Sequence, residues 1–123
     1  MKEDFVTYEQ AKTLKELGFD WECNQLYHAY DPNNIYESLY TNHNCFKKSY
    51  SAPTLAQAQK WFYKNHNIWI EISDYSKLNP DWGYKFTIIT PTDDGEASKS
   101  DYNDPFEALS AGINIVLELL KTN

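Results

Sequence analysis

Two cysteines and two histidines between residues 23 and 45 are the first candidates for chemistry in this chain: Cys23, His28, His43 and Cys45. Thiolate sulfur and imidazole nitrogen are ligands that zinc prefers, so such a group would form a structural zinc site. The spacings Cys-x4-His and His-x-Cys match no zinc pattern, and in the hairpin register expected below Cys23 points away from the other three. We therefore predict two free thiols, no metal and no cofactor.

Nucleophilic catalysis is the second chemistry to consider. Cys45 or Ser110 would need a histidine base and an orienting carboxylate, and the sequence does not place a histidine beside either. A Gly-x-Ser-x-Gly motif does not occur, and the 4 glycines are too scattered to cradle a phosphate. We therefore do not expect an enzyme. A small hydrolase is kept as an alternative, which requires His28, His43 or His66 within hydrogen-bond reach of a nucleophile or a carboxylate.

The charge balance of the 123-residue chain is acidic: 11 basic residues, every one a lysine, stand against 18 acidic residues, for a net charge of −7. Arginine is the preferred residue for bidentate contacts with phosphate and guanine, so direct binding of nucleic acid is not expected. The same acidity suggests an alternative, an acidic decoy that mimics nucleic acid and occupies a DNA-binding host protein through residues 93–104.

The first eight residues lack the apolar core of a signal peptide, and no apolar run approaches the length that crosses a bilayer. A cytoplasmic protein with no membrane contact is therefore expected. The length and the 41% apolar content suit one domain over residues 1–123.

Three helix starts are marked by a capping residue followed three positions later by Glu or Gln: Thr7 with Gln10, Thr54 with Gln57, and Asp104 with Glu107. In this arrangement side chains bond the first backbone N–H groups of a helix. Helices are therefore predicted from residue 8 to about 17, from 55 to about 65–67, and from 105 almost to the C-terminus.

A first β-hairpin is predicted from two β-rich runs, residues 23–30 and 35–46, which flank the type I turn sequence of residues 31–34. If Asp31 faces Asn34, one face of this hairpin is core and carries Leu26, Tyr30, Ile35 and Leu39. The opposite face is then a tyrosine-rich surface that carries Tyr27, Tyr36 and Tyr40.

A second hairpin is indicated by alternating apolar residues in 68–73 and 84–89, with a turn at 79–81. The isoleucines of the first run face the core, while Trp69 lies on the opposite face together with Ile89 of the partner strand. This second face is either an exposed apolar patch or is covered by helices. Residues 91–103 are polar and acidic and are predicted to form a long exposed loop.

The last predicted helix is unusually apolar, because Ile115 and Leu119 widen its apolar stripe beyond one ordinary face. Such a helix lies either in the centre of the domain or in an interface, and Gly112 would permit close approach of another backbone. We therefore expect a homo-oligomer that forms through this helix. A strict monomer in size-exclusion chromatography with light scattering would contradict this expectation.

These elements predict an α+β fold in the order helix, hairpin, helix, hairpin, helix, with an antiparallel sheet packed by helices. The capping boxes begin 47 and 50 residues apart, and each is followed by an alanine. A duplicated helix–hairpin unit closed by a third helix is one explanation. The other is that capping boxes before small residues are common.

Several segments together resemble a group of small proteins from phages, prophages and mobile elements of gut Bacteroidetes. They are residues 4–11 (DFVTYEQA), 14–20 (LKELGFD), Ala52-Pro53-Thr54, Gln57-Ala58, Trp61-Phe62, Gly83-Tyr84, and the acidic cap with Glu-Ala that opens the last helix. The resemblance covers nearly the whole chain. It implies a bacterial or phage cytoplasmic setting and an accessory or host-interaction role, and it carries over no catalytic or binding residue.

The function that the sequence favours is a non-catalytic interaction or accessory protein with an unidentified protein partner. The aromatic content of 16% without a catalytic constellation motivates this hypothesis. Its candidate surface lies on the two hairpins and the last helix, at Tyr27, Tyr36, Tyr40, Trp69, Ile89, Ile115 and Leu119.

Overall fold

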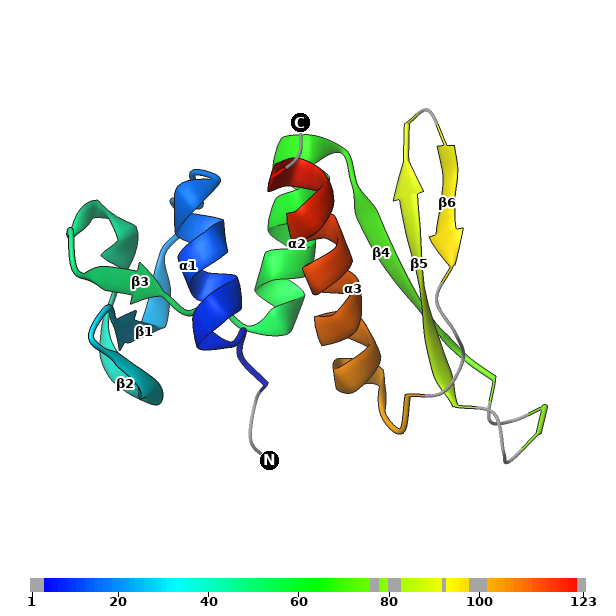
Figure 1. The fold of residues 1–123 in the computed structure, drawn as a ribbon, viewed down its shortest axis with the longest axis horizontal. Helices are drawn as coiled ribbons and strands as arrows, with labels where there is room; N and C mark the ends of the chain where they lie inside the picture. Colours follow the sequence, from blue (N-terminus) through cyan, green and yellow to red (C-terminus); the bar gives the residue numbers. More distant parts are fainter. Residues whose placement is uncertain (1–3, 76–77, 80–82, 92, 98–101, 122–123) are drawn as a thin grey trace. The chain divides into compact units, whose positions relative to one another are not determined.

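The computed structural model describes residues 4–75, 78–79, 83–91, 93–97 and 102–121 of the chain. Among these residues it shows three α-helices and two three-stranded antiparallel sheets, so the predicted α+β class is confirmed (Figure 1). The chain divides into a first unit, Met1–Gln57, and a second unit, Ala58–Asn123. The expectation of one domain over residues 1–123 stays a prediction.

The first unit holds helix α1, three strands and a short 3-10 helix. Their bounds are α1 (Tyr8–Glu16), β1 (Cys23–His28), β2 (Asp31–Thr41), η1 (His43–Cys45) and β3 (Ser49–Ser51). The capping box of α1 is confirmed, because Gln10 N donates to Thr7 Oγ1 (3.2 Å) and Thr7 N donates to Gln10 Oε1 (2.8 Å). The helix ends before Gly18, whose φ of +92° suits a residue without Cβ.

The sheet of the first unit has the order β2-β1-β3, so β1 is central and β2 is an edge strand. The predicted hairpin register is wrong: Tyr27, not Tyr30, pairs with Ile35, and Leu26 pairs with Tyr36. The turn falls at residues 29–30, and the expected turn residues 31–34 lie inside β2. Asp31 forms its local hydrogen bonds to the next residues within the strand, and the extra length is taken up as a bulge.

The predicted core face of this hairpin is confirmed at Leu26, which is buried, but is wrong at Tyr30, Ile35 and Leu39, which are exposed together with the rest of residues 32–40 of β2. Packing is concentrated on β1 and β3 instead. Tyr8 of α1 lies edge-on to Tyr27 and Tyr50, at ring-centroid distances of 5.7 and 5.5 Å. The edge strand β2 lies outside this aromatic contact, so its side chains remain exposed to solvent.

Lys15, in the last turn of α1, fixes the segment that follows η1. Its ammonium donates to the carbonyl oxygens of Phe46 (2.5 Å), Lys47 (3.3 Å) and Ser49 (2.9 Å). It also lies 5.3 Å from the centroid of the Tyr50 ring. Removal from water lowers the pKa of Lys15, and the three carbonyls take the place of the lost hydration.

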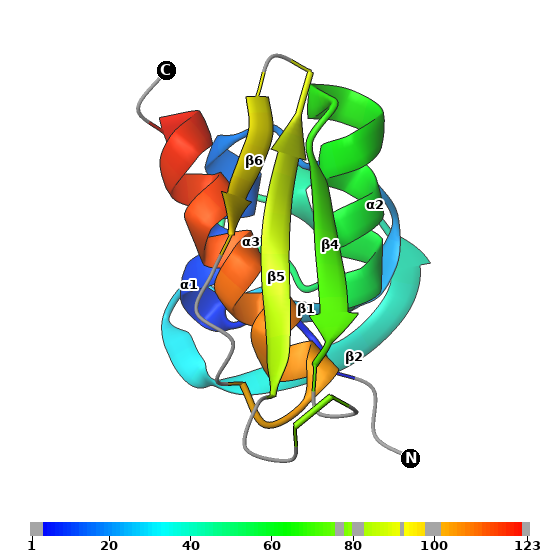
Figure 2. The same ribbon diagram turned by 90° about the vertical axis from the view of Figure 1, so that its right-hand side faces the viewer.

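The second unit contains most of helix α2 (Leu55–His66), three strands and helix α3 (Pro105–Lys121). The strands β4 (Trp69–Asp74), β5 (Tyr84–Thr90) and β6 (Asp93–Ala97) form a sheet in that order. The alternation predicted for β4 and β5 is confirmed, since Ile70 pairs with Ile88 and both are buried. Both helices lie on the same side of this sheet (Figure 2).

The exposed loop expected over residues 91–103 is corrected in part, because residues 93–97 form strand β6. They pair with the central strand β5, with Ile88 opposite Glu96 and Thr90 opposite Asp93. Backbone pairing of this kind does not require the apolar alternation by which strands are recognised in a sequence. Residues 98–101 lie outside the described part of the chain.

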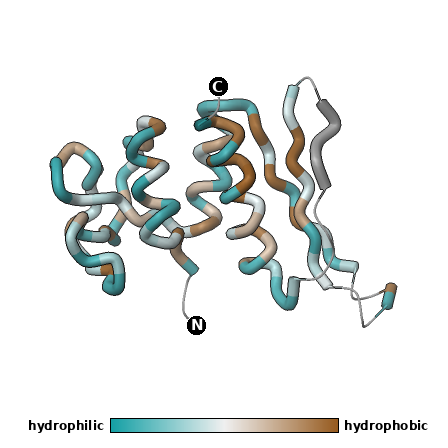
Figure 3. The backbone as a smooth tube through the Cα atoms, in the orientation of Figure 1, coloured by the Kyte–Doolittle hydropathy of each residue, from teal (hydrophilic) through white to brown (hydrophobic). Residues whose placement is uncertain are grey.

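Helix α3 packs its broad apolar stripe on β4 and β5, and its cap is confirmed by a 2.8 Å bond from Glu107 N to Asp104 Oδ1. Gly112 faces the sheet within this unit, where an added Cβ would lie 2.7 Å from Ile70 Cγ2 and 3.2 Å from Phe86 Cγ. The close approach predicted at Gly112 is therefore to side chains of its own sheet. Hydrophobic stretches are conspicuous in α3, β4 and β5 (Figure 3).

The strand orders of the two sheets differ, since the first strand is central in the first unit and the middle strand is central in the second. A duplicated helix–hairpin unit is therefore not confirmed. None of the described helices combines the length and apolar character that crossing a membrane requires.

Candidate interaction site

The residues predicted to form a surface are distributed over three places. Tyr27 is half-buried, and its hydroxyl donates to Val6 O at 2.8 Å. The expectation that it shares a face with Tyr36 and Tyr40 is wrong, because the observed register places it beside Ile35 and against α1. Burial raises the pKa of Tyr27.

Tyr36 and Tyr40 are exposed on β2, and three further large apolar side chains accompany them. We call this set the β2 surface: Tyr30 of the turn, and Ile35, Tyr36, Leu39 and Tyr40 of β2, where the neighbours Ile35 and Tyr36 lie on opposite faces of the ladder. Leu39 is 80% exposed and Tyr40 is 63% exposed. Both lie between Glu37, which pairs with Gln25, and Thr41, which pairs with Cys23. Four residues along β2 therefore span the same length of the ladder as two residues along β1. This bulge displays them away from the ladder.

One end of the β2 surface is an ordered aromatic cluster. The ring of Tyr30 stacks on the ring of His28 at 5.3 Å, with an interplanar angle of 10°, and Tyr36 lies 4.7 Å from His28 on a tilted plane. The Tyr36 hydroxyl donates to Asp31 Oδ2 at 2.5 Å, and Asn34 Nδ2 donates to the same carboxylate. We call these five residues the hairpin-tip cluster.

The electrostatics of the hairpin-tip cluster follow from these hydrogen bonds. The Tyr36 hydroxyl, and then the Asn34 amide, lower the pKa of Asp31 because they bond its ionised form. The same hydrogen bond to Asp31 raises the pKa of Tyr36. At neutral pH the cluster therefore presents a carboxylate beside two exposed aromatic rings.

Trp69 and Ile89 form a second, smaller group in the second unit. They are directly paired across β4 and β5, and Trp69 is 39% exposed. The ring of Tyr63, which the sequence did not single out, lies edge-on to Trp69 at 5.8 Å. We call these three residues the Trp69 patch.

Ile115 and Leu119 of α3 are 36% and 38% exposed, while Ile113 and Leu117 of the same helix are buried. The interior of the second unit thus takes up most of the apolar stripe. Ile115 and Leu119, together with Phe106 in the first turn, remain exposed on α3. Self-association through this helix stays a prediction.

The cysteines and histidines do not gather into one cluster of side chains among the described residues. Among the described residues, no group of three or more His, Cys, Asp or Glu side chains could hold a metal ion. His43 is buried with its Nε2 3.0 Å from Cys23 O, while Cys45 is exposed. His66 lies edge-on to Trp61 at 5.0 Å, and burial lowers the pKa of its imidazole. Neither contact joins His43 or His66 to a nucleophile, and the small hydrolase stays an alternative prediction.

The sequence pointed to Tyr36 and Tyr40 but missed Tyr30 and Asp31, which it placed in the core and in the turn. A signal was present: aromatic residues at 27, 30, 36 and 40 surround an Asp-Pro-Asn-Asn segment. The predicted register placed Tyr30 on the core face, so this group of aromatic residues was not recognised as one surface.

The comparisons with known proteins add no relative to this description. None of the protein-family models, curated proteins or solved structures matches the chain.

Proposed function

We propose that this protein is a non-catalytic interaction module that binds a partner protein through the β2 surface. The observation that carries the proposal is the exposure of a long edge strand, with Leu39 and Tyr40 displayed on a bulge. Burying a side chain of this size contributes about 1.5–3 kcal/mol. Tyrosine is also enriched among residues that dominate binding energy in interfaces.

The comparison with the Trp69 patch favours β2 as the main surface. In the Trp69 patch, Trp69 is 39% and Tyr63 is 51% exposed, whereas Leu39 and Tyr40 of the β2 surface are 80% and 63% exposed. Side chains with larger exposed fractions gain more binding free energy when a partner buries them, because less of their surface is already buried within their own unit.

The proposal is tested by capture from a host lysate with three forms of the protein. Leu39→Ser with Tyr40→Ser should abolish capture of a partner that the unmodified protein retains. Tyr63→Ala with Trp69→Ala, the matched control in the second unit, should retain that partner. Equal capture by all three forms, with unchanged circular dichroism, would refute binding through β2.

The cytoplasmic setting and the accessory role in a mobile element are expectations from the resemblance, and they stay part of this proposal. The acidic decoy stays an alternative prediction. The side chains of residues 93–97 and all of residues 98–101, on which it depends most, lie outside what the structure describes.

A further inference from the structure

We propose that the β2 surface receives a basic polypeptide segment, with an arginine or lysine side chain of the partner over Tyr30 and beside Asp31. Apolar side chains of the same segment would contact Leu39 and Tyr40. The inference rests on the proposed interaction function and names the chemistry of the partner.

The first support is charge. Residues 16–46, which include β1 and β2, contain five acidic residues and no lysine or arginine: Glu16, Asp20, Glu22, Asp31 and Glu37. Lys15, which borders this stretch, already donates its ammonium to three backbone carbonyls. A basic partner is therefore attracted at long range by this stretch and by the net charge of −7, while Lys48 lies next to the hairpin, where its carbonyl accepts from Ala29 N at 2.8 Å.

The second support is the geometry of Tyr30. Its ring is 75% exposed although one face is stacked in parallel on His28, so the other face is open to solvent. A tyrosine face held in place attracts a cation, and its prior ordering reduces the entropy that binding costs.

The third support is the carboxylate of Asp31. The hydroxyl of Tyr36 and the side-chain amide of Asn34, both neutral donors, bond this carboxylate. They hold the carboxylate in place without neutralising its charge. A guanidinium or ammonium group over Tyr30 would find a fixed negative charge close by.

Charge also argues against a second copy of this chain on the same surface. Antiparallel pairing of two β2 strands would bring Asp31 and Glu37 of both copies into one interface with no lysine or arginine from residues 16–46. Like charges in an interface are costly. The bulges of β2 further disfavour a long backbone ladder between two copies.

The test is a ¹H–¹⁵N NMR titration of the full chain with the synthetic peptide acetyl-Arg-Val-Arg-Val-Arg-amide. The matched peptide carries citrulline at each arginine position, which preserves shape and removes the charge. We expect shift changes centred on residues 28–41, and at least about tenfold weaker binding of the citrulline peptide. Binding should weaken as sodium chloride is raised.

Two variants locate the cation. Tyr30→Ala and Asp31→Asn should each weaken binding of the arginine peptide by about five- to tenfold. Tyr63→Ala, on the Trp69 patch, should leave binding unchanged. Because Tyr30 is 75% exposed, its replacement should leave the remaining spectrum intact.

Three results would overturn the inference: equal binding of both peptides, shift changes confined to the second unit, or no binding of the arginine peptide at millimolar concentration. Shift changes at residues 28–41 that depend on protein concentration alone would assign the surface to a second copy. If a partner is captured through Leu39 and Tyr40 but the arginine peptide does not bind, the basic partner is refuted and the interaction function stands.

Discussion

At the scale of single residues, the hydrogen bond from Tyr36 to Asp31 sets a pH dependence at the hairpin tip. The bond favours the ionised carboxylate, so the pKa of Asp31 is lower in the folded chain than the ordinary value of about 3.9. The stabilisation is therefore complete above about pH 3.9 and is lost as the pH falls through the folded pKa.

Tyr36→Phe removes this donor, and we predict that the pKa of Asp31 then rises toward its ordinary value. A ¹³C NMR titration of the Asp31 carboxyl group between about pH 2 and 6 measures this change. Tyr40→Phe, on the same strand, is the control and should leave the titration of Asp31 as it is. An unchanged Asp31 pKa in Tyr36→Phe would contradict the hydrogen bond.

The two cysteines provide a second prediction for single residues. Cys23 is 3% exposed and burial raises its pKa, whereas Cys45 is exposed. Since the thiolate is the reactive form, Ellman's reagent should label one thiol rapidly in the native protein and the other only on unfolding. Cys45→Ser should remove the rapid phase and Cys23→Ser should preserve it. Rapid labelling of two thiols in the native protein would show that Cys23 is accessible.

At the scale of elements, the contact of α3 with its sheet depends on the absence of a side chain at Gly112. Alanine is favoured over glycine in helices by about 1 kcal/mol, but the added Cβ would overlap the branched side chain of Ile70. Overpacking of this kind costs about 1–3 kcal/mol. We therefore predict that Gly112→Ala lowers the free energy of unfolding in urea by about 1 kcal/mol.

A double-mutant cycle separates overlap from a general defect in α3. Ile70→Ala alone creates a cavity, and in combination with Gly112→Ala the new methyl group fills part of it. The double variant should therefore be more stable than the sum of the single changes predicts. A Gly112→Ala protein that is more stable than the original would show that α3 is not in close contact with Ile70.

The elements that the sequence predicted well are those with local causes. Thr7, Thr54 and Asp104 cap helices through bonds to residues three positions away, and such signals are legible without knowing the fold. The β4–β5 pairing was predicted because strict alternation with a buried face permits one register.

The elements that were mispredicted depend on information outside the local pattern. The register of β2 is set by bulges and by the hydrogen bonds of Asp31, and the turn sequence of residues 31–34 was misleading on its own. Strand β6 has no apolar alternation in its sequence, and it forms by backbone pairing with β5, which a local pattern does not reveal. The candidate site was therefore half found: Tyr36 and Tyr40 were named, but the Tyr30 stack required the true register.

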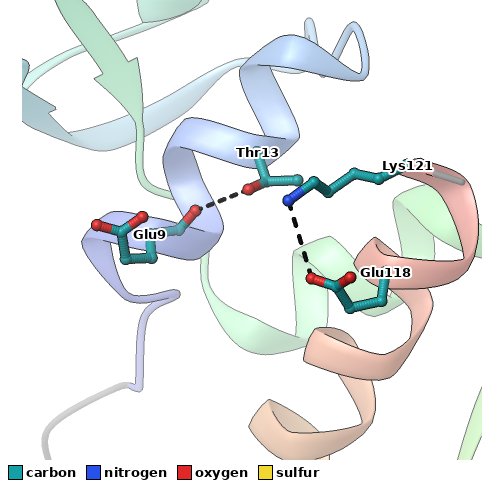
Figure 4. A network of polar contacts seen from close by, with 4 residues as sticks. All are labelled: Glu9, Thr13, Glu118 and Lys121. Carbon is teal, nitrogen blue, oxygen red and sulfur yellow. Dashed lines mark hydrogen bonds and ion pairs between the residues drawn. The ribbon is translucent and has the colours of Figure 1, made fainter.

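At the scale of the whole molecule, the dominant feature is an excess of negative charge. Some charges are locally compensated, as in the 3.8 Å ion pair between Lys121 and Glu118 (Figure 4). Both side chains of this pair are largely exposed, so it contributes at most about 1 kcal/mol. Figure 4 also shows the Thr13 hydroxyl bonding Glu9 O, a contact within α1 that neutralises no charge. A net charge of −7 therefore leaves unscreened repulsion in the folded chain.

Screening this repulsion should stabilise the protein. We predict that raising sodium chloride from about 20 to about 500 mM, which shortens the Debye length severalfold, raises the Tm by roughly 3–6 °C. Replacing Glu16, Glu22 and Glu37 by glutamine should reduce this increase, because these acids lie in the stretch without lysine or arginine. Lys12→Gln, the matched control, removes a positive charge and should enlarge the increase in Tm with salt. Differential scanning fluorimetry measures each response, and a Tm that falls with salt in the unmodified protein would mean that favourable ion pairs outweigh the repulsion.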